Sequence, residues 1–151
     1  MNSSQMWIRR AKHSDLTSLL QIIAPLQSTA FNWSEESFLS EFSFAKTWVY
    51  CKDQQIQAFL CLRDMSQAWE ISILATDLKF QRQKVMESFL FNLLEQIGYE
   101  RHFWLEVHEM NVPAQKLYQK LGFQKDGSRG GYYKDGSAAI LMSLHKSIIK
   151  P

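Results

Sequence analysis

The chain contains 151 residues, of which 46% are hydrophobic and 21% are charged, a composition typical of soluble globular proteins rather than disordered chains. This length fits one domain with a substantial core, so we expect a single domain over residues 1–151. The net charge of +2 is too small, and the charges are too dispersed, to indicate a nucleic-acid partner.

Two cysteines, Cys51 and Cys61, lie in apolar runs that predict neighbouring strands. Two thiols provide neither a disulfide framework nor the spacing of zinc ligands, so we interpret them as buried, reduced core residues. The N-terminus has no apolar run of the kind found in signal peptides, and no segment reaches the apolar length of a membrane span. We therefore expect a cytoplasmic protein without a membrane partner.

The N-terminal part of the chain predicts a short strand and two helices. The strand lies near residues 6–10. An amphipathic helix begins near Asp15 and ends before Pro25, because apolar residues recur between them at helical spacing. A second helix begins at Ser34, which is a good N-cap and is followed by two glutamates that suit the positive start of a helix.

Three strands and the longest helix follow. The segments 47–51, 55–63 and 68–76 are rich in β-branched and aromatic residues and are separated by short polar turns, which favours antiparallel hairpins. A helix is predicted over 81–97, where apolar residues form one broad face, and Gly98 provides a C-terminal stop.

The C-terminal part predicts a strand, a helix and two closing strands. The strand covers 102–108, and Asn111 caps a helix over 112–121. The closing strands lie near 123–127 and 138–145, around a Gly-rich turn. This order of elements predicts an α/β or α+β fold with a mixed sheet flanked by helices.

One carboxylate and one phenol in this last part are candidates for acid–base chemistry. Glu106 lies within an apolar strand, where a carboxylate that loses hydration becomes a better proton acceptor. Tyr118 lies on the following helix, which packs beside that strand. The alternative interpretation is purely structural: Glu106 pairs with a Lys or Arg at a strand end, and Tyr118 is a core residue whose hydroxyl finds a partner.

Other polar and aromatic residues near this segment carry weaker signals. His102 and His108 share the strand face of Glu106, but no third ligand follows at metal-binding spacing, so we expect no metal site. Trp33, Tyr132 and Tyr133 are candidates to line a groove, although aromatic residues of this kind also pack in cores.

Several segments together resemble the GNAT superfamily of acetyl-CoA-dependent N-acetyltransferases, and in particular its RimI type, whose members acetylate the N-terminal alanine of a ribosomal protein. The segments in chain order are AFNWSEESF, ILATDLKFQRQKVMESFL, WLEVHEMNVPAQKLYQKLGF, SRGGYY and AAILM. The resemblance covers most of the chain, and its last two blocks (WLEVHEMNVPAQKLYQKLGF and the closing SRGGYY with AAILM) carry the most specific pattern.

The resemblance implies a fold, a reaction and its partners. The fold is a mixed, mostly antiparallel central sheet of about seven strands flanked by about four helices. The reaction transfers acetyl from acetyl-CoA, the cosubstrate, to an amine, without a metal. The acceptor implied is a peptide or protein N-terminus, such as that of a ribosomal protein, and the oligomeric state is left open.

The resemblance also assigns roles to particular residues. Glu106 corresponds to the general base, Tyr118 to the general acid, and Asn111 to a residue that contacts the cofactor. The strand residues that hydrogen-bond pantetheine correspond to Leu74, Ala75 and Thr76, and the pyrophosphate loop corresponds to Arg82, Gln83, Lys84, Val85, Met86 and Glu87.

This chain departs from the family pattern in the pyrophosphate loop. Both glycine positions carry side chains, Lys84 and Met86, although glycine lets a phosphate approach the N–H groups at a helix start. Glu87 stands where the RimI type often has Arg, and a carboxylate there repels a pyrophosphate. Two interpretations follow. Either Lys84 and Arg82 supply charge in place of close backbone contact, or the domain is a non-catalytic binding module.

Overall fold

The computed structural model describes residues 5–28 and 31–146 of the chain. Within these residues, the strands are β1 (Met6–Arg10), β2 (Lys46–Lys52), β3 (Gln55–Asp64), β4 (Ala68–Thr76), β5 (His102–His108), β6 (Gln124–Arg129) and β7 (Ala139–Leu144). The helices there are α1 (Leu16–Ile23), α2 (Glu35–Phe44), α3 (Val85–Ile97) and α4 (Val112–Lys120), with 3-10 turns at His13–Asp15, Ala24–Leu26 and Leu78–Phe80.

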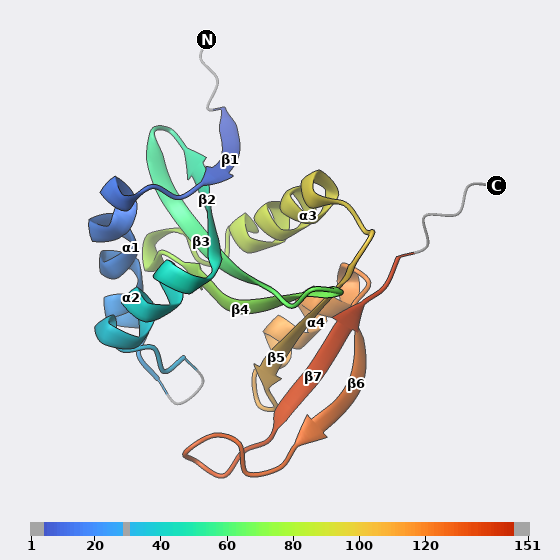
Figure 1. The fold of residues 1–151 in the computed structure, drawn as a ribbon. Coiled ribbons are helices and arrows are strands. Elements are labelled where there is room, and N and C mark those ends of the chain that lie inside the picture. The colour runs from blue at the N-terminus through green and yellow to red at the C-terminus, as the bar shows by residue number, and fades with distance from the viewer. Residues whose placement is uncertain (1–4, 29–30, 147–151) are drawn as a thin grey trace, which may run out of the picture.

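All seven strands of the described residues join one sheet in the order β1-β2-β3-β4-β5-β7-β6. Only β4 and β5 pair in parallel, and every other neighbouring pair in this sheet is antiparallel. Helices α1 and α2 cover one face, whereas α3 and α4 cover the other (Figure 1). The expected mixed, mostly antiparallel sheet with flanking helices is therefore confirmed.

Each face of the sheet has its own core, because side chains alternate along the strands. On β3, Ala58, Leu60 and Leu62 pack toward α3, whereas Phe59 and Cys61 pack toward α1 and α2. Cys51 is buried in the same core as Cys61, and both thiols are free. Among the described residues, no helix has the length and apolar character required to span a membrane.

An irregularity in β4 opens the sheet at its centre. Ile73 pairs with Cys61 and Ile71 pairs with Leu62, so Ser72 is an extra residue that forms a β-bulge. On the other side, β4 pairs with β5 only from Ala68 to Ile71. The two strands then diverge, and in the described part of the chain no strand pairs with the β5-facing edge of residues 72–76.

The predicted helix over 81–97 is wrong at its start, since α3 begins at Val85. The reason lies in the backbone: Arg82 and Lys84 adopt left-handed conformations, with φ of 65° and 61°, which a right-handed helix cannot include. Residues 81–84 are therefore a loop between a 3-10 turn and α3. The other predicted strands and helices exist, with ends shifted by a few residues, as in β6, which continues to Arg129.

Candidate active site

A cleft of about 960 Å³ lies where β4 and β5 diverge. Its walls include most of the residues singled out in the sequence, namely Leu74, Ala75, Thr76, Arg82, Lys84, Val85, Met86, Glu87, Glu106, Asn111 and Tyr118. Trp33, Tyr132 and Tyr133 line it as well. Gln83 does not: it borders a separate hollow behind the loop, beside Tyr50 and Ser88. This volume lies near the upper end of the range found for small-molecule pockets, so it suits a sizeable ligand.

Glu106 and Tyr118 reach the cleft from opposite sides of the sheet. On β5, Phe103, Leu105 and Val107 pack into the core beneath α3 and α4, so Glu106 faces the other way. Tyr118 comes from α4, within the core that these residues share. The divergence of β4 from β5 lets both polar groups border one space.

The Glu106 carboxylate is largely buried and lies next to a cation. Its side chain is 16% exposed, and its Oε2 lies 3.0 Å from Nε of Arg129 on β6. The angles of this contact are not those of a hydrogen bond, and Oε2 accepts none from the described residues. The structural interpretation, in which Glu106 pairs with a Lys or Arg, is therefore met by Arg129. The paired carboxylate nevertheless lines the cleft.

Tyr118 is a buried phenol. Burial raises its pKa to about 12, with a smaller contribution from the neighbouring Tyr133. The hydroxyl is therefore protonated at neutral pH and can act only as a proton donor or hydrogen-bonding group. Such a group suits the protonation of a leaving group, not the removal of a proton.

The turn after β5 is held by hydrogen bonds from the side chains of Asn111 and His108. Asn111 caps α4, since its Oδ1 accepts the N–H of Ala114 at 3.2 Å. Nδ1 of His108 accepts the N–H of Met110 at 3.1 Å, so its proton is on Nε2, which lies 3.0 Å from the Asp135 carboxylate.

His108 therefore connects β5 to the loop between β6 and β7. Its ring lies against that of Tyr133, with centroids 4.6 Å apart, which positions Tyr133 in the cleft wall. Within the described ranges, 5–28 and 31–146, no group of three or more His, Cys, Asp or Glu residues is arranged to hold a metal ion.

The loop before α3 has the backbone of a glycine-rich loop without the glycines. Lys84 occupies the N-cap in a left-handed conformation, and its side chain makes no capping hydrogen bond. The first helical bond runs from the N–H of Ser88 to the carbonyl of Lys84, at 3.0 Å. The N–H groups of residues 85–87 precede that bond and lie at the positive end of the helix dipole.

Glu87 has a partner that the sequence did not reveal. Its carboxylate lies 2.9 Å from the Nζ of Lys120, near the end of α4. Lys120 lowers the pKa of Glu87 through this contact. The negative charge beside the loop is therefore balanced by a cation from the next helix, which reduces the repulsion that a pyrophosphate would meet there.

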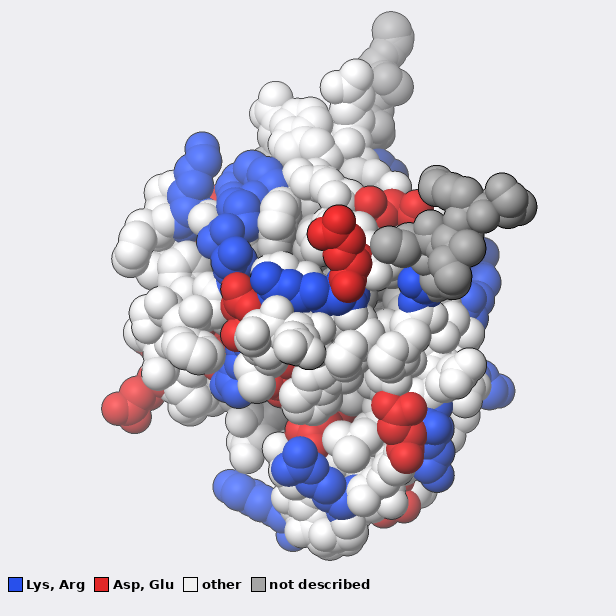
Figure 2. All heavy atoms as spheres, turned by 45° about the vertical axis from the view of Figure 1, so that its right-hand side comes forward, with Lys and Arg blue, Asp and Glu red and all other residues white. Residues whose placement is uncertain are grey.

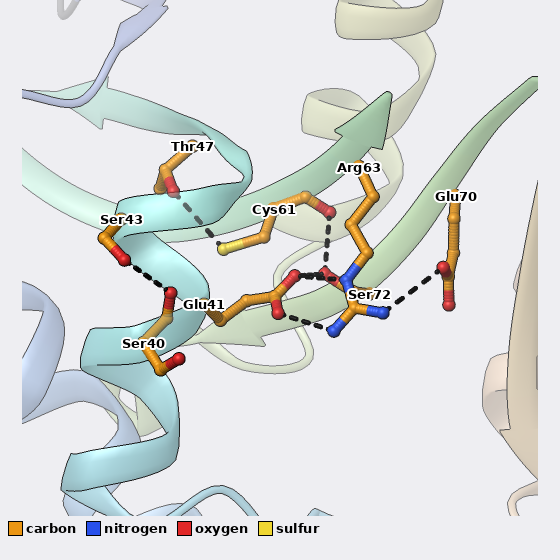
Figure 3. A network of polar contacts seen from close by, with 8 residues as sticks. All are labelled: Ser40, Glu41, Ser43, Thr47, Cys61, Arg63, Glu70 and Ser72. Atoms are coloured by element: carbon orange, nitrogen blue, oxygen red, sulfur yellow. Dashed lines mark hydrogen bonds and ion pairs between the residues drawn. The ribbon is translucent and has the colours of Figure 1, made fainter. Parts of the chain in front are cut away.

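A buried ion pair fixes α2 to the bulge of β4 (Figure 3). Both carboxylate oxygens of Glu41 accept hydrogen bonds from Arg63, at 2.6 and 2.8 Å, and Ser72 Oγ donates to one of them at 2.6 Å. Arg63 also lies 3.6 Å from Glu70. Because Ser72 is the bulged residue, this network holds the strand where it leaves β5.

Two charged residues that interact with Glu106 were missed by sequence reasoning. Arg129 lies in the SRGGYY segment, which was recognised only as part of a closing hairpin. Glu70 is a lone carboxylate within an apolar strand, which is the same signal that drew attention to Glu106. On the face of the molecule in Figure 2, basic and acidic side chains are interspersed.

Comparison with known proteins agrees with this architecture. The Acetyltransferase (GNAT) family matches residues 16–123. The [ribosomal protein bS18]-alanine N-acetyltransferase of Escherichia coli K12 is 30% identical over 125 residues, which cover 76% of this chain and 82% of that protein. The crystal structure of the ribosomal-protein-S18-alanine N-acetyltransferase from Escherichia coli superimposes with a TM-score of 0.83 at 27% identity, covering 97% of each chain.

A more distant relative shares the fold with its ligand present. The GNAT family acetyltransferase from Elizabethkingia anophelis, crystallised with acetyl-CoA bound, has a TM-score of 0.78 at 16% identity, covering 93% of this chain and 98% of that chain. GNAT acetyltransferases use acetyl-CoA as the acetyl donor. The family match spans more than half of this chain, and the sheet opens between β4 and β5 as described above. The chain therefore belongs to the GNAT acetyltransferase family and is an N-acetyltransferase of the RimI-like type.

Proposed function

We propose that this enzyme acetylates the N-terminal amine of a protein, with the N-terminal alanine of ribosomal protein bS18 as the acceptor and acetyl-CoA as the donor. The acceptor is suggested by the relatives named for that substrate. The observation that carries the proposal is the cleft between β4 and β5, which places a carboxylate and a protonated phenol on its walls.

The described residues fit acetyl-CoA as a ligand. The unpaired edge of β4 at Leu74, Ala75 and Thr76 offers backbone groups of the kind that bind a pantetheine amide chain. At the start of α3, the free N–H groups and the basic side chains of Arg82 and Lys84 suit a pyrophosphate. Acetyl-CoA supplies the activated thioester carbonyl when it is bound.

In this proposal, Glu106 accepts a proton from the acceptor's ammonium, directly or through a water molecule, and Tyr118 donates a proton to the departing thiolate. Asn111, which lies between these two residues in the sequence, also lines the cleft. In this proposal it contacts the cofactor. The pKa of Tyr118, raised to about 12, keeps its proton in place until a strong base develops beside it. Holding amine and thioester together contributes most of the rate gain.

Two measurements test the proposal. Isothermal titration with coenzyme A should show binding, and incubation with acetyl-CoA and a bS18 N-terminal peptide should acetylate the alanine amine and release free thiol. The same peptide with a blocked N-terminus is the control and should not react. Absence of coenzyme A binding at millimolar ligand would contradict the proposal and would favour the non-catalytic alternative for the altered loop.

A further inference from the structure

Five charged residues, one on α2 and four on strands, form a row on the side of the sheet that carries α1 and α2. They are Glu41 on α2, Arg63 on β3, Glu70 on β4, Glu106 on β5 and Arg129 on β6. Arg63 joins Glu41 and Glu70, at 2.6 and 3.6 Å, and Arg129 joins Glu106 at 3.0 Å. The signs along the row are therefore negative, positive, negative, negative and positive.

The two carboxylates in the middle of this row are neighbours. Glu70 pairs with Trp104 across the parallel strands, and Glu106 lies two residues beyond Trp104 on the same face. The Glu70 side chain is 14% exposed. Burial raises the pKa of Glu70, Arg63 lowers it, and the charge of Glu106 raises it again, so the two carboxylates influence each other electrostatically.

The charges of the row do not balance, and one of its carboxylates, Glu106, lines the cleft. The row has three carboxylates and two guanidinium groups, so one negative charge is uncompensated within it. Arg63 is shared, and its bonds to Glu41 are shorter than its contact with Glu70. The charge of Glu70 is therefore less fully compensated than that of Glu41, and it acts on Tyr132, a cleft-lining residue whose pKa is raised by burial and by both Glu106 and Glu70.

The ion pair at Glu106 indicates that a cation fits beside this carboxylate. Arg129 is 55% exposed and comes from an edge strand, and such a solvent-screened pair contributes little to stability. The Glu106 Oε2 is buried but accepts no hydrogen bond from the described residues. An ammonium group with three donors would satisfy that oxygen better than the contact with Arg129 does.

We propose that Glu70 is a second carboxylate of the acceptor site, which acts with Glu106 to attract and orient the protonated amine of the acceptor. This inference rests on the proposed function, since it assumes a cationic amine as the acceptor. Arg63, which is itself held by Glu41, lies 3.6 Å from Glu70, and in this proposal the ammonium takes the place of the Arg129 guanidinium beside Glu106.

The test compares a charged and an uncharged ligand. The probes are a bS18 N-terminal peptide and its des-amino analogue, in which propanoyl replaces alanyl, each titrated with coenzyme A present. Wild-type protein should prefer the amine peptide. Glu70→Gln should reduce that preference about tenfold, the scale expected for a nearby charge in a partly buried site. The KM for the peptide should rise more than kcat falls.

Matched variants separate charge from structure. Glu70→Asp keeps the charge and should retain most of the preference, whereas Glu95→Gln removes an exposed carboxylate on α3 and should change nothing. Glu70→Thr, which suits a strand, is a second neutral variant in case Glu70→Gln does not fold. A structural role alone would lower thermal stability in these variants without changing the ratio of the two affinities.

The pH dependence gives an independent readout. Burial raises the pKa of Glu70, Glu106 and Glu41 raise it further, and Arg63 and Arg129 lower it, with a net upward shift. In wild type, part of the preference for the amine should disappear as acidification protonates Glu70. Glu70→Gln should lack that component.

Three outcomes distinguish this inference from the proposed function. An unchanged preference in Glu70→Gln, with normal acetylation by the wild type, would overturn the role of Glu70 and leave the proposed function intact. A wild type that acetylates the amine peptide but binds the two peptides equally would likewise overturn only this inference, whereas a wild type that binds coenzyme A but does not acetylate the peptide would contradict the proposed function.

Discussion

The two ends of the cleft are built in different ways. At the end where we propose the acid–base chemistry (the chemical end), Glu106 and Tyr118 are placed by a strand and a helix whose other side chains fill the core. At the end proposed to bind the pyrophosphate (the phosphate end), the loop 81–84 depends on left-handed backbone at Arg82 and Lys84. Core packing fixes the first end through many contacts, whereas the second depends on a few torsion angles. Side chains can therefore change at the phosphate end while the shape of the loop is kept.

The largest expected effect is at the chemical end. Glu106→Gln keeps the size of the side chain but removes the proton acceptor, so kcat should fall about a thousandfold. Coenzyme A affinity should hardly change, because the residues of the phosphate end are untouched. Steady-state kinetics with the bS18 peptide, together with isothermal titration of coenzyme A, measures both quantities.

The control for this variant is Glu109→Gln, which alters a carboxylate just after β5 that accepts a hydrogen bond from the backbone N–H of Ala138. It should leave turnover close to that of the wild type. A wild-type rate in Glu106→Gln would remove Glu106 as the base and would leave the chemical end without a proton acceptor.

The second effect concerns the network that holds the bulge of β4. Glu41 is 4% exposed, and Glu41→Gln removes the closer of the two carboxylates that Arg63 contacts, which should lower the free energy of unfolding by about 3 kcal/mol. Burial acts to raise the pKa of Glu41, but bonds from Arg63 and Ser72 outweigh it and lower the pKa.

The sign of the pH dependence follows from that lowered pKa. The pair stabilises the fold above the pKa that Glu41 has in the unfolded chain, and this stabilisation is lost as the pH falls through the folded-state pKa. Urea unfolding between neutral and acidic pH should therefore show a smaller loss of stability in Glu41→Gln than in the wild type. Equal losses would show that other carboxylates dominate acid unfolding.

The sequence predicted the chemical end better than the phosphate end for a physical reason. Alternation along β5 and the cap of α4 by Asn111 are local patterns, and they located Glu106 and Tyr118. The left-handed torsions of Arg82 and Lys84 have no signal in the residue types, so α3 was predicted to begin too early. The partners of Glu87 and Glu106 lie far away in the chain, on α4 and β6, and pairing at that distance is not readable from spacing.

The third effect concerns Tyr118, which reaches the cleft from the opposite side of the sheet to Glu106. Tyr118→Phe removes the proposed proton donor and should lower kcat about a hundredfold, less than Glu106→Gln, because water can replace a general acid in part. A high-pH limb of the wild-type profile that reports Tyr118 should lie near its pKa of about 12. The ratio of the wild-type rate to the Tyr118→Phe rate should be smaller when the leaving group is a more acidic thiol, because such a thiolate needs less protonation. The same ratio should fall as the pH rises. An unchanged ratio would argue that Tyr118 only packs.

The smallest effect is at the phosphate end, where three forms of one residue separate charge from shape. Lys84 has φ of 61°, so Lys84→Ala removes the charge and keeps the strained Cβ, whereas Lys84→Gly removes both. Lys84→Gly should be about 1 kcal/mol more stable than Lys84→Ala, because glycine adopts this conformation without strain.

Lys84→Ala should bind coenzyme A about fivefold more weakly than the wild type if the ammonium compensates for the absent glycine. Lys84→Gly should recover affinity relative to Lys84→Ala, since a phosphate can then approach the N–H groups of α3. Equal affinity in all three proteins would mean that residue 84 contributes neither charge nor space, and that Arg82 and the α3 dipole alone hold the pyrophosphate.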